Sequence, residues 1–283
     1  MQKRPLEPSR IPRKRYEKIT SSSTSYITAH EQEFIELPTD SVSAFESIVT
    51  QVSKTSGFPL VIPGCFIHQI YTIISDKTIV KQELLEARRN GLLRHLFVDG
   101  CGTLLVRESD YREMIRKLIE AADLDENAKF EKKLLERFLN QVLPSCFDLG
   151  IPRSHLLELL SLSSSEQSLA TSSLLRLGFV VFQTQTMAPE DPLFWFTIPN
   201  LGIFIREVKA GRKELISLIQ KSWPSRQVFL SKLLQKGRLK GTTLPMEFHI
   251  KDCVGLGIII ARDSTLEGKA SIFILPDKLT EVG

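Results

Sequence analysis

The chain has 283 residues, 42% of them hydrophobic, which is enough for one large domain or two to three small ones with a substantial core. No apolar run reaches the roughly 18 residues of a membrane span, and the first five residues lack the apolar stretch of a secretory signal. The four cysteines form no CxxC pair and the five histidines do not cluster, so we expect an intracellular protein with reduced, mostly buried cysteines and with neither a metal nor a cofactor.

The net charge of +4 is distributed unevenly along the chain. Residues 1–18 contain seven lysines and arginines against two glutamates, and residues 206–240 contain ten against two, which leaves the rest of the chain acidic. Two concentrated basic segments on an acidic protein indicate a polyanionic partner and a targeting tail.

The basic start of the chain has the pattern of a disordered targeting segment. Residues 1–40 contain few apolar side chains and a serine-rich run, so we expect them to be disordered. Two short basic clusters within this tail resemble a bipartite nuclear localisation signal and predict a nuclear protein. The residues concerned are Lys3, Arg4, Arg13, Lys14 and Arg15.

A repeated order of elements is predicted from residue 41 onward. Apolar periodicity predicts three helices and then two strands, over 41–54, 66–74, 77–89, 92–98 and 103–106. Ser75-Asp76 offers an N-cap for the third helix, and Asn90-Gly91 supplies its stop. Three helices followed by a hairpin make a winged helix, which is an elaborated helix-turn-helix.

The same order returns twice. The second unit has helices expected over 110–122, 130–142, 153–160 and 164–177, then strands over 179–184 and 194–197. The third has helices expected over 201–221, 226–235 and 246–254, then strands over 258–262 and 270–275. The sequence therefore predicts a mainly helical α+β chain with three tandem winged-helix domains after the tail, at 1–40, 41–108, 109–199 and 200–283.

Two stretches look catalytic but lack essential groups. The run around Asp99 is similar to the nucleophile strand of a haloacid-dehalogenase-type phosphatase, yet Cys101 stands where that chemistry needs a second acid. Gly255-Leu256-Gly257 lacks the rest of a phosphate loop and is better explained as a helix end. No set of kinase motifs and no Ser/His/Asp arrangement is present, so we expect no catalytic residues and no enzyme. Trp195 and Trp223 are expected to pack in the core or a wing.

An ordered set of short motifs resembles the serine/threonine kinase nineteen family. The first set comprises Phe58–Pro63, Gln69–Tyr71, Asp76–Val80 and Glu83-Leu84; the second Asp110–Arg112 and Val142–Leu149; the third Ile198-Pro199, Gly202, Phe204-Ile205, Gly211-Arg212, Leu230-Ser231, Leu233-Leu234, His249-Ile250 and Asp252. The resemblance runs in order over about residues 45–276. It implies three tandem winged helices that bind double-stranded DNA and RNA, no kinase motifs, and a nuclear role in transcription-coupled nucleotide excision repair.

The resemblance also implies basic positions that contact nucleic acid. The family's basic residue after the helix-capping aspartate falls on Lys77, which stands at a helix start and is well placed against a phosphate. The family's two later basic pairs survive here only in part, as Lys221 and as Lys236 with Arg238, because Gln220 and Gly237 fill the other places. Neighbouring cations would extend this surface: Lys209, Arg212, Lys213 and Arg226.

We therefore expect binding to duplex DNA, and to RNA, through phosphate contacts with weak sequence preference. Transcription-coupled repair proteins are the expected protein partners, no membrane is expected, and a homodimer stays open. The first alternative is a nuclear protein-interaction scaffold without direct nucleic-acid binding, and a distant second is a hydrolase built around Asp99. Winged helices serve the first two roles equally, so the fold cannot decide between them.

Overall fold

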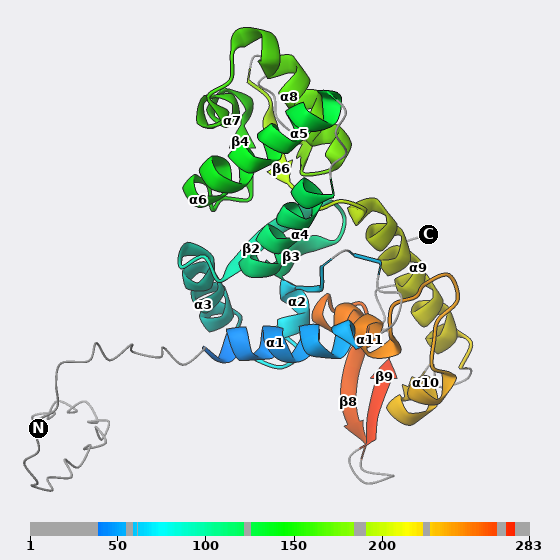
Figure 1. Cartoon of the computed structure of the whole chain (residues 1–283). Helices are drawn as coiled ribbons and strands as arrows, with labels where there is room; N and C mark the ends of the chain where they lie inside the picture. The colour runs from blue at the N-terminus through cyan, green and yellow to red at the C-terminus, as the bar shows by residue number, and fades with distance from the viewer. Residues whose placement is uncertain are drawn as a thin grey trace, which may run out of the picture. The chain divides into compact units, whose positions relative to one another are not determined.

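The computed structural model describes residues 39–54, 59–60, 62–121, 126–183, 191–222, 227–264 and 270–274. The chain divides into residues 1–37 and residues 38–283, and all the described residues belong to the second part (Figure 1). The basic clusters Lys3-Arg4 and Arg13–Arg15 lie outside the described residues, as do Trp223 and Arg226. None of the described helices combines the length and hydropathy that crossing a bilayer requires.

The described part is mainly helical with three small antiparallel sheets, as expected for an α+β chain. The first segment contains α1 (Asp40–Ser53), β1 (Gly64–Phe66), α2 (Ile67–Ile70), α3 (Lys77–Arg89), β2 (Leu93–Val98) and β3 (Gly102–Arg107). Thr39 caps α1, and the Asp76 carboxylate caps α3 by accepting from the backbone N–H groups of Thr78 and Ile79 at 2.9 and 3.1 Å. Helix α3 therefore begins where the sequence predicts it.

The second segment has more helices than the first. It contains α4 (Glu108–Glu120), α5 (Glu126–Arg137), a π-helical turn (Phe138–Val142), α6 (Leu143–Ser145), β4 (Gly150–Pro152), α7 (Arg153–Leu160), α8 (Ser164–Leu177), β5 (Val180–Phe182) and β6 (Leu193–Phe196). The third contains α9 (Leu201–Gln220), β7 (Gln227–Phe229), α10 (Leu230–Lys236), α11 (Met246–Gly255), β8 (Ile260–Ser264) and β9 (Ala270–Ile274).

One strand in each sheet was not predicted. The sheets have the orders β1-β3-β2, β4-β6-β5 and β7-β9-β8, so an early short strand pairs with the last strand of each hairpin. The helices predicted over 66–74 and 226–235 consequently begin later, at Ile67 and Leu230, after β1 and β7. Three residues are too few to show the alternating pattern of a strand, and the pairing that defines them comes from more than 35 residues away.

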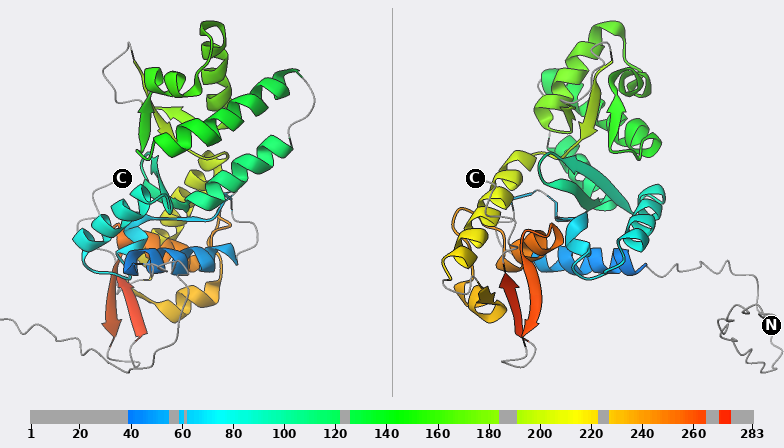
Figure 2. Two further views of the ribbon diagram at one scale, coloured as in Figure 1. Left: turned by 60° about the vertical axis from the view of Figure 1, so that its left-hand side comes forward. Right: turned by 180° about the vertical axis from the view of Figure 1, so that it is seen from behind.

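The segments share a hydrophobic core. Its largest cluster runs from Ala44 to Phe248 and draws buried side chains from all three segments, while a smaller cluster lies within the third, from Leu215 to Phe273. The first and second segments meet at the β2–β3 hairpin (Figure 2), where the Phe97 and Trp195 rings lie 5.0 Å apart. Trp195 therefore packs against a neighbouring hairpin, as expected.

Candidate nucleic-acid interface

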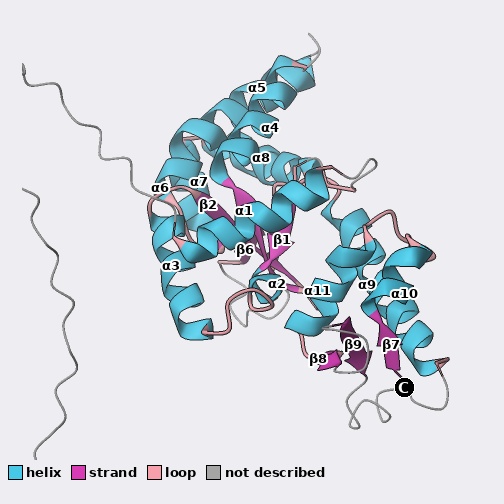
Figure 3. Cartoon of the chain, turned by 90° about the horizontal axis from the view of Figure 1, so that it is seen from below, coloured by secondary structure: helices cyan, strands magenta, loops and turns pink. Residues whose placement is uncertain are grey.

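Helix α11 is buried between α2 and α9 (Figure 3). Six of its ten residues are buried: Met246, Phe248, His249, Ile250, Asp252 and Cys253. The Phe248 carbonyl accepts a hydrogen bond from Gln69 Nε2 at 3.1 Å, and its ring packs near those of Phe66 and Phe204. In a helix–helix–hairpin unit this helix is the one that commonly reads DNA. Here it joins the third segment to the first.

A buried carboxylate completes this joint. Asp252 accepts from Arg212 at 2.6 Å (Nε to Oδ2) and 2.8 Å (Nη2 to Oδ1), and its Oδ1 lies 2.8 Å from His68 Nε2. Burial alone would raise the pKa of Asp252, but the hydrogen bonds from Arg212 and His68 outweigh it and hold that pKa below its ordinary value. Arg212 is thus fixed in a bidentate pair, with its side chain only 12% exposed.

Two glycines allow the close packing around α11. A Cβ at Gly211 of α9 would overlap the ring of His249, and one at Gly255 would overlap the backbone carbonyl of His68. Burial lowers the pKa of His249 to about 4, so the ring is neutral near pH 7. Its Nε2 lies 3.2 Å from Thr242 Oγ1. The joint therefore packs a neutral His249 tightly beside the Arg212–Asp252 ion pair.

The opposite face of α9 is exposed and cationic. Arg206, Lys209 and Lys213 recur at helical spacing on this face, and Lys221 caps the C-terminal end. The two glutamates of the helix are engaged elsewhere, because Glu207 accepts from the backbone N–H of Thr243 at 2.8 Å and Glu214 lies 3.9 Å from Lys236. The exposed face of α9 thus presents cations without intervening acids.

The predicted cations occupy three kinds of position. Lys209, Lys213 and Lys221 lie on the exposed face and end of α9, and Lys209 also lies beside Gly100 at the tip of the first hairpin. Lys236 and Arg238 are exposed at and after the end of α10. Lys77 begins α3, a different helix, with its Nζ 5.4 Å from the centre of the Tyr71 ring. Arg212 is set apart by its pairing with Asp252.

Further exposed cations lie beside the predicted ones. Arg206, Lys232 and Lys240 belong to the same basic segment of the sequence, and Lys81 and Arg89 lie on α3. Arg206, Lys232 and Lys240 were counted in the charge excess over residues 206–240 but were not predicted as contacts. Helical spacing from Lys209 and from Lys77 could have pointed to Arg206 and Lys81.

The catalytic-looking stretches are structural. Asp99 is exposed in the turn between β2 and β3, where Gly100 has a φ of 68°, and Gly255–Gly257 ends α11, with Gly257 at a φ of 73°. Both interpretations made from the sequence are confirmed. All four cysteines are buried, and no metal-binding group of three or more histidines, cysteines and acids occurs among the described residues.

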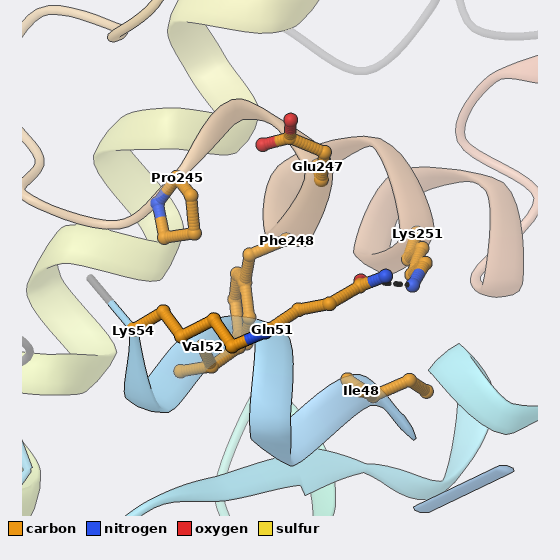
Figure 4. A pocket seen from close by; sticks show the side chains of 8 residues that line it. All are labelled: Ile48, Gln51, Val52, Lys54, Pro245, Glu247, Phe248 and Lys251. Atoms are coloured by element: carbon orange, nitrogen blue, oxygen red, sulfur yellow. Dashed lines mark hydrogen bonds between the residues drawn. The ribbon is translucent and has the colours of Figure 1, made fainter.

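A pocket of about 360 Å³ lies between α1 and α11 (Figure 4). Ile48, Val52 and Phe248 form apolar parts of its wall, and Lys251 Nζ donates across it to Gln51 Oε1 at 2.7 Å. Among the described residues that line it, Glu247 is the one acid, and none is a histidine or a cysteine. The polar part of the lining thus comes from Lys54, Glu247 and the hydrogen-bonded pair of Lys251 and Gln51.

A family model described as inactive serine-threonine protein kinase 19 matches residues 30–263, from before α1 into β8. The chain belongs to this family. The resemblance seen in the sequence is thereby confirmed, and the word "inactive" in the family's description agrees with the missing kinase motifs.

Similar proteins carry the name Winged helix repair factor 1. The human protein is 23% identical over 193 residues, which span 68% of this chain and 69% of that protein. The Xenopus laevis protein is 26% identical over 70% of each chain. The Dictyostelium discoideum protein is 29% identical over 144 residues, which span 50% of this chain and 35% of that one. The matched region of the family includes both the α11 joint and the exposed face of α9.

Proposed function

We propose that this chain binds double-stranded DNA, and RNA, through phosphate contacts with weak sequence preference. The observation that carries the proposal is the exposed face of α9, where Arg206, Lys209 and Lys213 follow one another while Glu207 and Glu214 face other partners. Lysine and arginine side chains that neutralise backbone phosphates release condensed counterions, which supplies affinity without sequence information.

The burial of α11 supports the same proposal. A helix with Phe248, His249 and Asp252 packed against other segments cannot also enter a groove of DNA. The third segment would therefore contact nucleic acid with α9 and the end of α10, through charge and shape. Lys221, Lys236, Arg238 and Arg226 belong to the proposed contact set with Lys77, Lys209 and Lys213, whereas Arg212 would act by holding α9 against α11.

The proposed architecture is three tandem winged-helix domains at 41–108, 109–199 and 200–283, after the basic tail at 1–40. Three sheets with the same strand order, each closing a helix–strand–helix–helix–hairpin series, support it. The names of the relatives support a winged-helix repair factor, and we place its action in transcription-coupled nucleotide excision repair in the nucleus. We propose no enzymatic activity, and repair proteins as partners.

The double variant Lys221→Glu with Lys236→Glu tests the proposal. It should weaken binding to two unrelated duplexes by similar factors and flatten the dependence of affinity on salt, because each lost phosphate contact removes about 0.9 from the log–log slope. Exposed Lys→Glu changes should leave the melting temperature nearly unchanged. Asp99→Asn at the hairpin tip is the control. Unchanged affinity and slope in a folded double variant would exclude the ends of α9 and α10 from the phosphate-binding surface.

A second candidate function rests on a different observation. In the second segment Val181 and Phe182 on the edge strand β5 are 42% and 53% exposed, and Leu169 on α8 is 49% exposed. Apolar side chains on an open strand edge suit a protein partner better than a phosphate backbone. A nuclear scaffold that docks other proteins through this segment would show duplex binding that is absent or insensitive to the lysine changes above.

A further inference from the structure

The helices that directly precede the three hairpins, α3, α8 and α11, differ in what they expose. Helix α11 is mostly buried. Exposed side chains at the start and along the outer face of α8 are chiefly serines, among them Ser164, Ser165, Ser168 and Ser172. Helix α3 alone combines an open face with several exposed cations. Helix α3 is therefore the helix of the three that is best suited to produce the weak sequence preference of the proposed function.

The buried face of α3 fixes which side chains point outward. Val80, Leu84 and Ala87 pack into the core, and Glu83 accepts a hydrogen bond from the backbone N–H of Ser41 at 3.0 Å. The opposite face carries Thr78, Gln82 and Glu86 at four-residue spacing, all exposed. The helix is thus anchored on one side and open on the other.

Cations flank this open face. Lys77, Lys81 and Arg89 are exposed on α3 and form no ion pair with any residue that the structure describes, whereas Arg88 lies 3.6 Å from Asp148. The two sides of a major groove are lined with phosphates, so cations beside a row of hydrogen-bonding side chains match the groove in charge. A phosphate would repel the Glu86 carboxylate, so α3 can bind in the groove only if Glu86 faces a base edge.

The central row has the chemistry of base readout. Gln can bond adenine N6 and N7 at once, Glu can accept from cytosine N4, and the Thr methyl can contact the thymine methyl. We infer that α3 enters the major groove of duplex DNA and that Gln82, with Thr78 and Glu86, gives the chain its sequence preference. This inference rests on the proposed function, because it names the readout element of a protein proposed to bind duplexes.

The same geometry predicts a choice between nucleic acids. The major groove of A-form RNA is too deep and narrow for side chains to read. Phosphate contacts from α9 would hold either duplex, but discrimination among base pairs through α3 should occur on DNA alone.

The test is enrichment of duplexes from a randomised DNA pool by the full chain, followed by affinity measurements on the selected sequence and its single-base-pair variants. Wild type should select a short motif containing adenine. Gln82→Ala should lower discrimination at one base pair by about fivefold or more, the lower end expected for one bidentate contact. Its salt slope, its affinity for unrelated duplexes and its melting temperature should stay unchanged.

Gln220→Ala is the matched control, since it removes the same exposed group from α9. It should leave the preference intact. Salt-dependent binding without any preference, an unchanged preference in Gln82→Ala, or equal discrimination on duplex RNA would each overturn the inference and leave the proposed function standing. An absence of salt-dependent binding to any duplex would overturn both.

Discussion

Helices α11 and α3 hold the same place in two repeats of one element order, yet they have opposite surroundings. Helix α11 is closed in by α2 and α9 and holds a buried ion pair, whereas α3 is anchored on one side and exposes cations on the other. The position of a helix in the repeat therefore does not determine whether it is buried or exposed. Changes at α11 should affect stability, and changes on α3 or the exposed face of α9 should affect binding.

The largest expected effect is at the ion pair of the joint. Asp252→Ala removes the partner of both Arg212 and His68 and leaves a guanidinium without its counter-charge in a mostly buried site. We expect the free energy of unfolding to fall by about 3–5 kcal/mol, measured by urea denaturation. Glu247→Ala, an exposed acid on the same helix, should change it by less than about 0.5 kcal/mol. Equal effects would mean that the joint is not buried as described.

A smaller loss is expected from the glycine that faces His249. Gly211→Ala should destabilise the protein by roughly 2 kcal/mol, because overpacking outweighs the gain in helix propensity. Gly202→Ala on the same helix has open space around the added methyl and should be neutral or slightly stabilising. Thermal melting of the two variants side by side is the measurement. A stabilised Gly211→Ala would show that α9 and α11 are not in close contact.

Acid should destabilise the joint, because the buried His249 resists protonation in the folded protein. The pKa of His249 in the folded protein is about 4, below the ordinary value near 6.5, so the unfolded chain takes up a proton first as pH falls. Stability present above about pH 6.5 should therefore be lost as pH falls from 6.5 towards 4, on the order of 2 kcal/mol at pH 4.5. Burial lowers the pKa of His95 similarly. In His249→Gln the free energy of unfolding should depend less steeply on pH than in wild type. An identical dependence would contradict the lowered pKa of His249 in the folded protein.

The smallest effect is expected at the tip of the first hairpin. Asp99 is exposed in a turn, so Asp99→Asn should change the free energy of unfolding by less than about 0.5 kcal/mol and should leave duplex binding unchanged. A large loss of stability or of binding would mean that the Asp99 side chain itself contributes to folding or to duplex binding.

Local sequence signals predicted most of the helices. The features that they did not predict, the short strands and the pairing of Arg212, depend on tertiary contacts. The N-cap at Asp76, the stop at Asn90-Gly91 and the apolar spacing of α7 and α8 act within a few residues, so those boundaries were predicted closely. Strands β1, β4 and β7 depend on pairing with distant residues and were not predicted. Arg212 was predicted as a phosphate contact because a basic segment does not show that Asp252, 40 residues away, pairs with one of its members.

The central claim is that exposed cations bind the phosphates of duplexes, and the salt dependence of wild-type binding tests it most directly. The affinity of the full chain for two unrelated duplexes should be measured over a range of salt concentrations. We expect a steep, linear fall of log affinity with log salt, with a slope of about −3.6 if about four phosphates are neutralised, and nearly the same slope on both duplexes. A slope near zero, or no binding at low salt, would contradict it.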